Sequence, residues 1–188
     1  MTPSFDVASV LAIQQMIFAT PWMSTVAIFC ARWLIVLVVC SVCAMVFSRS
    51  LRLRHAVREV FWSACIAIIL ATSLSTLFLR PRPFVAHPDV RLLIPIPYNT
   101  SFPSGHTATA VAIACAVFVA DPFVGGIAIV LAAFVAMGRI AVGVHYPSDI
   151  VGGIIIGLFS YALVRAGHYA VRRNEIAHAS ERRRQNKN

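Results

Sequence analysis

Three short polar stretches interrupt a chain that is otherwise strongly apolar. They read LRPRPF, FPSGH and GRIAVGVHYPSD, and their chemically active residues are Arg80, Arg82, Ser104, Gly105, His106, Arg139, His145 and Asp149. Arginine guanidinium groups grip phosphate oxygens through paired, charge-assisted hydrogen bonds. A helix that starts with Ser-Gly-His offers free backbone N–H groups and the positive end of the helix dipole, which together bind anions. These residue types therefore indicate a site for a phosphate group.

The histidines of these stretches supply reactive groups. His145 precedes Asp149 by four residues, and a histidine whose tautomer is fixed by a carboxylate can act as a nucleophile. The second histidine, His106, is suited to protonate a leaving oxygen as a general acid. Asp149 also stands where it would cap the helix that follows, a role compatible with orienting His145. Arginines, N–H groups and two histidines together predict phosphoryl transfer.

The elements that must position these residues are membrane-spanning helices. The 188 residues are 59% hydrophobic and 12% charged, whereas soluble domains carry about 25% charged residues. Mean hydropathy is +0.80. Crossing a bilayer core takes about 20 apolar residues. The predicted spans are Trp22–Phe47, Val60–Leu79, Thr107–Ala120 with its flanks, Phe123–Val144, and Ile150–Val164 with the residues after it.

A shorter helix precedes these spans. The segment FDVASVLAIQQMIF alternates apolar and polar residues at helical spacing, and its length suits a helix lying on the membrane surface. We therefore predict an all-α, polytopic membrane helix bundle of five spans plus this interfacial helix, with a sixth crossing left open. Residues 1–188 form a single domain: 1–21 the interfacial helix, 22–164 the catalytic bundle, and 165–188 the end of the last helix and a basic tail.

The distribution of basic residues predicts the orientation. The net charge of +9 is concentrated in two places: Arg49, Arg52, Arg54 and Arg58, and then Arg165, Arg172, Arg173, Arg182, Arg183, Arg184 and Lys187. The positive-inside rule makes both regions cytoplasmic. Five spans then put all three polar stretches on the extracytoplasmic side. The basic tail is read as an orientation signal, and no nucleic-acid partner is expected.

The three stretches resemble the signature motifs of the type 2 phosphatidic acid phosphatase superfamily, which also includes vanadium haloperoxidases. That pattern is a lysine, six residues, then Arg-Pro; next Pro-Ser-Gly-His; then Ser-Arg, five residues, His, three residues, Asp. Arg82–Pro83 fits the first motif, and Pro103–His106 fits the second completely. Arg139, His145 and Asp149 fit the third at the expected spacing.

The resemblance implies a role for each matching residue. His145 would be the nucleophile that forms a phosphohistidine, Asp149 would orient it, and His106 would be the general acid. The residues implied to hold the phosphate are Arg82, Arg139, Ser104 and Gly105. The family's phosphatases need no metal, and we expect no metal and no other cofactor here. Of the seven acidic residues, only Asp89 and Asp149 fall in segments assigned to the site.

Two positions depart from the family pattern. Ser75 stands where the lysine is expected, seven residues before Arg82, and Gly138 stands where a serine should precede Arg139. Arg80 is a candidate to supply the missing positive charge, or else an interfacial anchor. Both departures concern the clamping of the phosphate and leave the nucleophile and the acid in place.

Within the superfamily, the small size and the stretch RPRPFVAHPDVRLLIP…SFPSGHT resemble the bacterial undecaprenyl pyrophosphate phosphatases. This implies hydrolysis of undecaprenyl diphosphate to undecaprenyl phosphate on the outer face of the bacterial inner membrane, which recycles the lipid carrier for peptidoglycan synthesis. Phosphatidylglycerophosphate, phosphatidic acid and lipid A remain alternative substrates. A lipid transporter or an anion channel with a ring of arginines remains a non-enzyme alternative.

Overall fold

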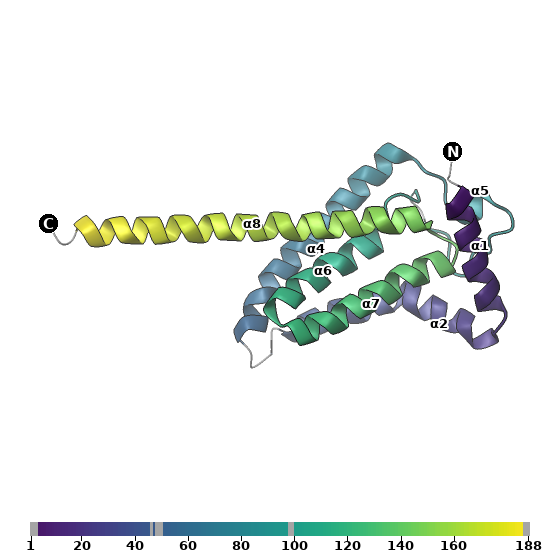
Figure 1. Ribbon diagram of the computed structural model, residues 1–188, viewed down its shortest axis with the longest axis horizontal. Coiled ribbons are helices and arrows are strands. Elements are labelled where there is room, and N and C mark those ends of the chain that lie inside the picture. Colours follow the sequence, from purple (N-terminus) through teal and green to yellow (C-terminus); the bar gives the residue numbers. More distant parts are fainter. Residues whose placement is uncertain (1–3, 46, 48–50, 98–99, 186–188) are drawn as a thin grey trace.

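The computed structural model describes residues 4–45, 47, 51–97 and 100–185, which fold into helices joined by turns and loops. In chain order the helices are α1 (Ser4–Phe18), α2 (Pro21–Arg32), α3 (Leu34–Met45), α4 (Leu51–Phe78), α5 (Pro83–Ala86), α6 (Gly105–Ala120), α7 (Pro122–Ala141) and α8 (Pro147–Gln185). The described residues contain no strand, and Figure 1 shows most of these helices packed side by side. The predicted all-α bundle is confirmed.

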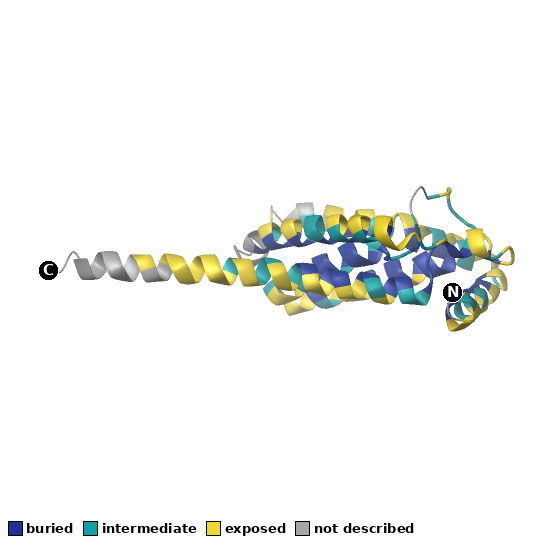
Figure 2. Ribbon diagram, turned by 90° about the horizontal axis from the view of Figure 1, so that it is seen from above, coloured by how far each residue is buried: buried dark blue, intermediate teal, exposed yellow. Residues whose placement is uncertain are grey.

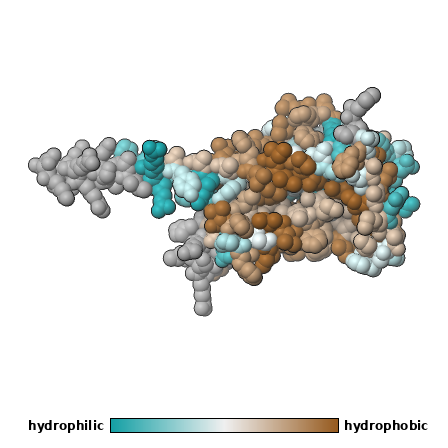
Figure 3. Space-filling view, viewed as in Figure 1, coloured by the Kyte–Doolittle hydropathy of each residue, from teal (hydrophilic) through white to brown (hydrophobic). Residues whose placement is uncertain are grey.

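Helices occupy all five predicted spans, although not all reach full length. Within the described residues, three stretches are long and apolar enough to cross a membrane: Ala56–Ala86, Pro122–Ala141 and Pro147–Glu175. The pair α2 and α3 passes the same test as one span bent by 42°. The remaining predicted span, α6, has only 16 residues. Figure 3 shows the apolar surface over the bundle, with more hydrophilic residues at the end where α1 lies and along the extension of α8.

The short helix α6 is the centre of the bundle and packs against α4, α7 and α8. At about 1.5 Å per residue it is some 24 Å long, less than the roughly 30 Å of a hydrocarbon core. Protein rather than lipid surrounds most of it, because alanines along its length, from Ala108 to Ala116, are buried. The N-terminus of α6 therefore lies inside the bundle, and Ser104 at its N-cap is fully buried.

Two glycines on α8 let α6 approach closely. A Cβ atom at Gly153 would lie 2.7 Å from the carbonyl oxygen of Ser104, and one at Gly157 would lie 2.6 Å from that of Ala108. Small residues spaced by four are a common device for helix contact in membranes. The contact brings the start of α6 to the first turn of α8, where the Ser104 N–H donates to the Asp149 carbonyl over 3.1 Å.

The two ends of the chain extend differently from the bundle. Helix α1 crosses the end of the bundle steeply, whereas α8 continues far beyond the other helices. Figure 2 shows buried residues between the helices and exposed residues along the extension of α8. The last helix runs from Pro147 to Gln185 and thus includes residues after Val164, which the prediction also assigned to it. Arg49 and Lys187, two of the basic residues behind the predicted orientation, lie outside the described residues.

Candidate active site

His145 lies in the turn between α7 and α8 and is buried. Its Nδ1 atom is 2.7 Å from the backbone carbonyl oxygen of Ser101. Because a carbonyl oxygen only accepts, Nδ1 carries the hydrogen and Nε2 keeps its lone pair. Nε2 lies 3.4 Å from Nη1 of Arg82. Burial lowers the pKa of His145 to about 4, so the ring is neutral near pH 7 and Nε2 can act as a nucleophile.

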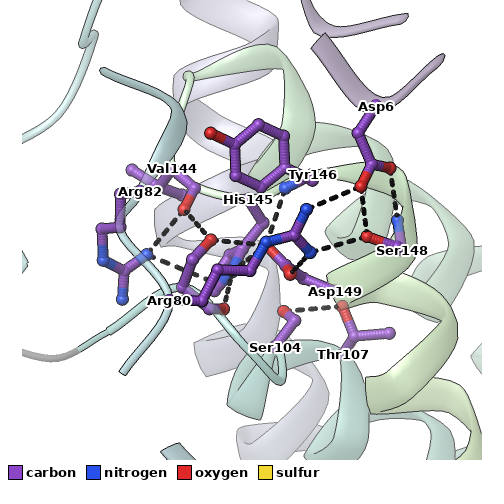
Figure 4. A network of polar contacts seen from close by, with 11 residues as sticks. Asp6, Arg80, Arg82, Ser104, Thr107, Val144, His145, Tyr146, Ser148 and Asp149 are labelled. Carbon is purple, nitrogen blue, oxygen red and sulfur yellow. Dashed lines mark hydrogen bonds and ion pairs between the residues drawn. The ribbon is translucent and has the colours of Figure 1, made fainter. Parts of the chain in front are cut away.

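Asp149 lies in the first turn of α8, beside His145. Its Oδ2 atom accepts from the Tyr146 backbone N–H over 2.8 Å and also from the Ser101 hydroxyl. The same oxygen lies 3.6 Å from Nδ1 of His145. The other oxygen, Oδ1, accepts from Nη1 of Arg80 over 2.5 Å. Figure 4 shows these contacts converging on one carboxylate. The Asp149 carboxylate therefore lies both at the start of α8 and beside His145, as the sequence predicted for each position separately.

Ser101 contacts the predicted His145–Asp149 pair, although no motif in the sequence indicated it. Its carbonyl accepts from His145 and its hydroxyl donates to Asp149, so it contacts both partners of the predicted pair. It is fully buried. The only sequence signal is its position two residues before Pro103, and a serine there has no distinguishing spacing.

Arg139 extends from α7 into the site, and one of its donor atoms is unpaired within the described part of the chain. Its Nη1 atom donates to the Ala31 carbonyl over 3.2 Å, while its buried Nε atom has no hydrogen-bond partner among the described residues. A buried unpaired donor is costly, and an anion in the site would satisfy it. The glycine before it also has a physical reason. A Cβ atom at Gly138 would lie 2.7 Å from the backbone nitrogen of Ala31, so the close packing of α2 leaves no room for the expected serine.

Arg82 and His106 complete the predicted group. Arg82 is buried and its Nη1 atom donates to the Val144 carbonyl over 2.7 Å. His106 is the second residue of α6 and is half-buried. Electrostatic interactions connect it with His145, Arg82 and Arg139, although these residues come from three separate segments of the sequence. The structure therefore brings the reactive histidines and two of the arginines into one region.

The start of α6 has the geometry of an anion cradle. Ser104 is the N-cap residue, yet its side chain does not cap the helix. Its hydroxyl instead lies 3.0 Å from that of Thr107. Gly105 and His106 occupy the first turn, where backbone N–H groups lack intrahelical acceptors. Binding of a phosphate by Ser104 and Gly105 stays a prediction that this geometry permits.

Arg80 has partners that the sequence did not suggest. One nitrogen donates to Asp149 and the other to Asp6, which lies in α1. Its guanidinium group thus joins two carboxylates, and a direct contact with phosphate stays a prediction. The expectation that only Asp89 and Asp149 lie with the site was wrong on acidic residues, because Asp6 joins Asp149 while Asp89 is exposed.

Ser75 lines a pocket of about 490 Å³ together with Arg80, Arg82 and Thr100. Its hydroxyl donates to the Thr72 carbonyl in its own helix over 2.8 Å. The position where the family lysine would stand therefore does face the arginines, and here it carries a short, internally bonded side chain. Among the described residues, no three histidine, cysteine, aspartate or glutamate side chains gather as metal ligands would.

Comparison with known proteins identifies the family of this chain. The family described as the PAP2 superfamily matches residues 69–173, more than half of the chain. Undecaprenyl-diphosphatase BcrC of Bacillus subtilis strain 168 is 34% identical over 91 residues, which cover 48% of this chain and 47% of the relative. The putative undecaprenyl-diphosphatase YbjG of Escherichia coli K12 is 29% identical over 141 residues, covering 74% of this chain and 71% of the relative.

A solved structure shares the fold. The crystal structure of Aquifex aeolicus LpxE superposes with a TM-score of 0.73 at 24% identity, covering 88% of this chain and 97% of that one. The chain spans about half the length of the first curated relatives that it matches. The matched region, residues 69–173, contains all three polar stretches.

Proposed function

Because this chain belongs to the PAP2 superfamily, we propose that it is a membrane lipid phosphatase that hydrolyses undecaprenyl diphosphate to undecaprenyl phosphate and inorganic phosphate. One observation carries the proposal. The unprotonated Nε2 atom of His145 lies beside Arg82, and the nearby Arg139 keeps a buried donor without a partner among the described residues. A nucleophile next to arginines, one of which has an unsatisfied donor, suits attack on a phosphoryl group.

The proposed reaction has two steps. Nε2 of His145 attacks the terminal phosphorus, the bond from phosphorus to the bridging oxygen breaks, and His106, which takes up a proton when the anionic diphosphate binds beside it, gives that proton to the leaving lipid phosphate. Water then attacks the phosphohistidine, His106 takes its proton, and inorganic phosphate leaves with His145 regenerated. Arg82, Arg139 and the first turn of α6 would hold the phosphoryl oxygens as charge develops on them. None of these steps calls for a metal or another cofactor.

An apolar pocket supports a lipid substrate. A space of about 250 Å³ between α1, α2 and α7 is lined by side chains such as Met23, Val26 and Phe134, and by Gly138. Gly138 directly precedes Arg139 in the sequence, although Arg139 itself does not line this space. An apolar space of this kind suits a polyprenyl tail. The basic residues support an orientation with the site on the extracytoplasmic face of a bacterial inner membrane and the C-terminus in the cytoplasm.

The test measures phosphate release by the purified protein in detergent with EDTA. Substrates are undecaprenyl diphosphate, phosphatidylglycerophosphate, phosphatidic acid and lipid A. We expect the highest kcat/KM for undecaprenyl diphosphate, and a His145→Ala variant should lose about 10⁴-fold or more in turnover. The control is His168→Ala, which should stay within about twofold because it removes a half-exposed histidine outside the site.

Each other outcome identifies an alternative. A higher kcat/KM for another lipid would reassign the substrate while keeping the reaction. An active His145→Ala variant would remove the nucleophile assignment. Lipid or anion movement across vesicles without phosphate release would favour the transporter or channel. Loss of activity in EDTA, restored by a divalent ion, would indicate a metal-dependent mechanism.

A further inference from the structure

Helix α1 buries two polar side chains, Asp6 and Gln14, together with the apolar Val10 and Ile17. Asp6 and Gln14 are 2% and 3% exposed, whereas Phe5 and Met16 on the same helix are 72% and 67% exposed. Polar side chains of a surface helix ordinarily meet water, and these two do not. Buried polar side chains need partners, and both residues find them in the segments that carry the site.

Asp6 uses both carboxylate oxygens on those segments. Oδ1 accepts from the backbone N–H of Ser148 over 3.0 Å. Oδ2 accepts from Nη2 of Arg80 over 2.7 Å and from the hydroxyl of Ser148. Arg80 follows α4 and Ser148 is in the first turn of α8, so one acidic residue of α1 ties together two elements that hold the site (Figure 4).

Arg80 contacts Asp149 as well as Asp6. Its Nη1 atom donates to Oδ1 of Asp149 over 2.5 Å, on the opposite oxygen from the one that faces His145. The guanidinium carbon also lies 4.2 Å from the ring centroid of Tyr146, which restricts its position. The arginine side chain is only 17% exposed and has a carboxylate on each side. Removing one carboxylate would leave a nearly buried cation to be balanced by Asp149 alone.

We propose that Asp6 is a positioning residue of the phosphatase, which acts through Arg80 to hold Asp149, and with it His145, in the reactive arrangement. The inference rests on the proposed function. It assigns to the N-terminal helix a part in catalysis beyond membrane attachment. Asp6 balances the charge of Arg80, so Asp149 keeps its bonds to Tyr146 and Ser101 and stays beside the His145 ring.

The first experiment compares Asp6→Asn with Gln14→Leu. Gln14 anchors the same helix through hydrogen bonds to the backbone of Arg91 and to the Ala141 carbonyl, and none of these bonds goes to Arg80 or Asp149. We expect Asp6→Asn to lower kcat about tenfold with KM nearly unchanged, and Asp6→Glu to recover part of that loss. Gln14→Leu should lower the Tm without lowering kcat. Equal losses of kcat in both variants would reduce Asp6 to a structural anchor and overturn the proposal.

A double-mutant cycle tests the route through Arg80. If Asp6 acts through that arginine, the Asp6→Asn and Arg80→Gln pair loses no more activity than Arg80→Gln alone. Losses that multiply would contradict the route. A second readout does not depend on turnover: Asp6→Asn should shift the ¹⁵N resonances of the His145 ring, while Gln14→Leu leaves them unchanged. If the wild-type protein hydrolyses no lipid phosphate, the proposed function fails, yet the resonances still decide whether Asp6 controls His145.

Discussion

Two clusters of the same residue types lie at opposite ends of the bundle. The site-end cluster consists of Arg82, Arg139, His145 and Asp149. The tail-end cluster consists of Glu59 on α4 with Arg165 and His168 on α8. Each combines a carboxylate with histidine and arginine, so residue type alone does not separate a reactive group from a structural ion pair.

The tail-end cluster is satisfied and partly open to solvent. Arg165 donates to both oxygens of Glu59 over 3.0 and 3.2 Å, and Nδ1 of His168 lies 2.6 Å from Oε1 of Glu59. The arginine and histidine side chains are 32% and 38% exposed. In the site-end cluster, by contrast, Nε of Arg139 is buried without a partner in the described part of the chain. Burial and an unpaired donor, rather than residue composition, therefore distinguish a candidate ligand site from a structural ion pair.

The largest expected effect comes from the same substitution at both ends. Arg139→Lys keeps the charge but removes the unpaired Nε donor, so kcat/KM for phosphate release should fall by about 10²-fold. Arg165→Lys should leave kcat/KM within about twofold and cost at most about 1 kcal/mol of unfolding free energy. Phosphate-release assays on the detergent-purified variants measure kcat/KM, and unfolding of the same samples measures the change in free energy. Similar activities for the two variants would show that Arg139 is a structural residue like Arg165.

A smaller effect is expected from two glycines of α8, one packed against α6 and one in open space. Gly157→Ala places a methyl group 2.6 Å from the Ala108 carbonyl oxygen, so it should lower the free energy of unfolding by about 1–3 kcal/mol. A Cβ atom at Gly167 would meet no atom of the described residues within 4 Å, and Gly167→Ala should stabilise the helix by up to about 1 kcal/mol. Thermal unfolding in detergent measures both. A neutral Gly157→Ala would contradict the close α6–α8 contact.

The smallest expected effect concerns the His145 ring, which should keep the same protonation state near neutral pH. Burial lowers the pKa of His145 to about 4, whereas a histidine in an unfolded chain titrates near about 6.5. The ring ¹⁵N shifts of His145 should therefore stay constant between about pH 7 and pH 5.5. Because the unfolded chain binds the proton more tightly, stability should fall as the pH drops from about 6.5 towards 4. A midpoint near the ordinary value would show that the ring is open to water.

Local sequence determined the helices and the motif residues that the structure brings together. Long apolar runs predict helices because the backbone must satisfy its own hydrogen bonds in lipid, and helices stand at all five predicted places. The four-residue spacing of His145 and Asp149 also predicts their proximity, and the two lie 3.6 Å apart. The match of residues 69–173 to the PAP2 superfamily confirms the resemblance drawn from the motifs.

Tertiary structure decided the supporting contacts. Ser101 lies 44 residues from His145, and Asp6 lies 74 residues from Arg80 and 142 from Ser148. The glycine before Arg139 is explained only by the backbone of α2. Such partners have no common period or spacing, since they meet only after the helices pack. Helix formation and motif spacing follow local physics that a sequence records, whereas burial, unmet donors and distant hydrogen-bond partners arise from the packing of the whole chain.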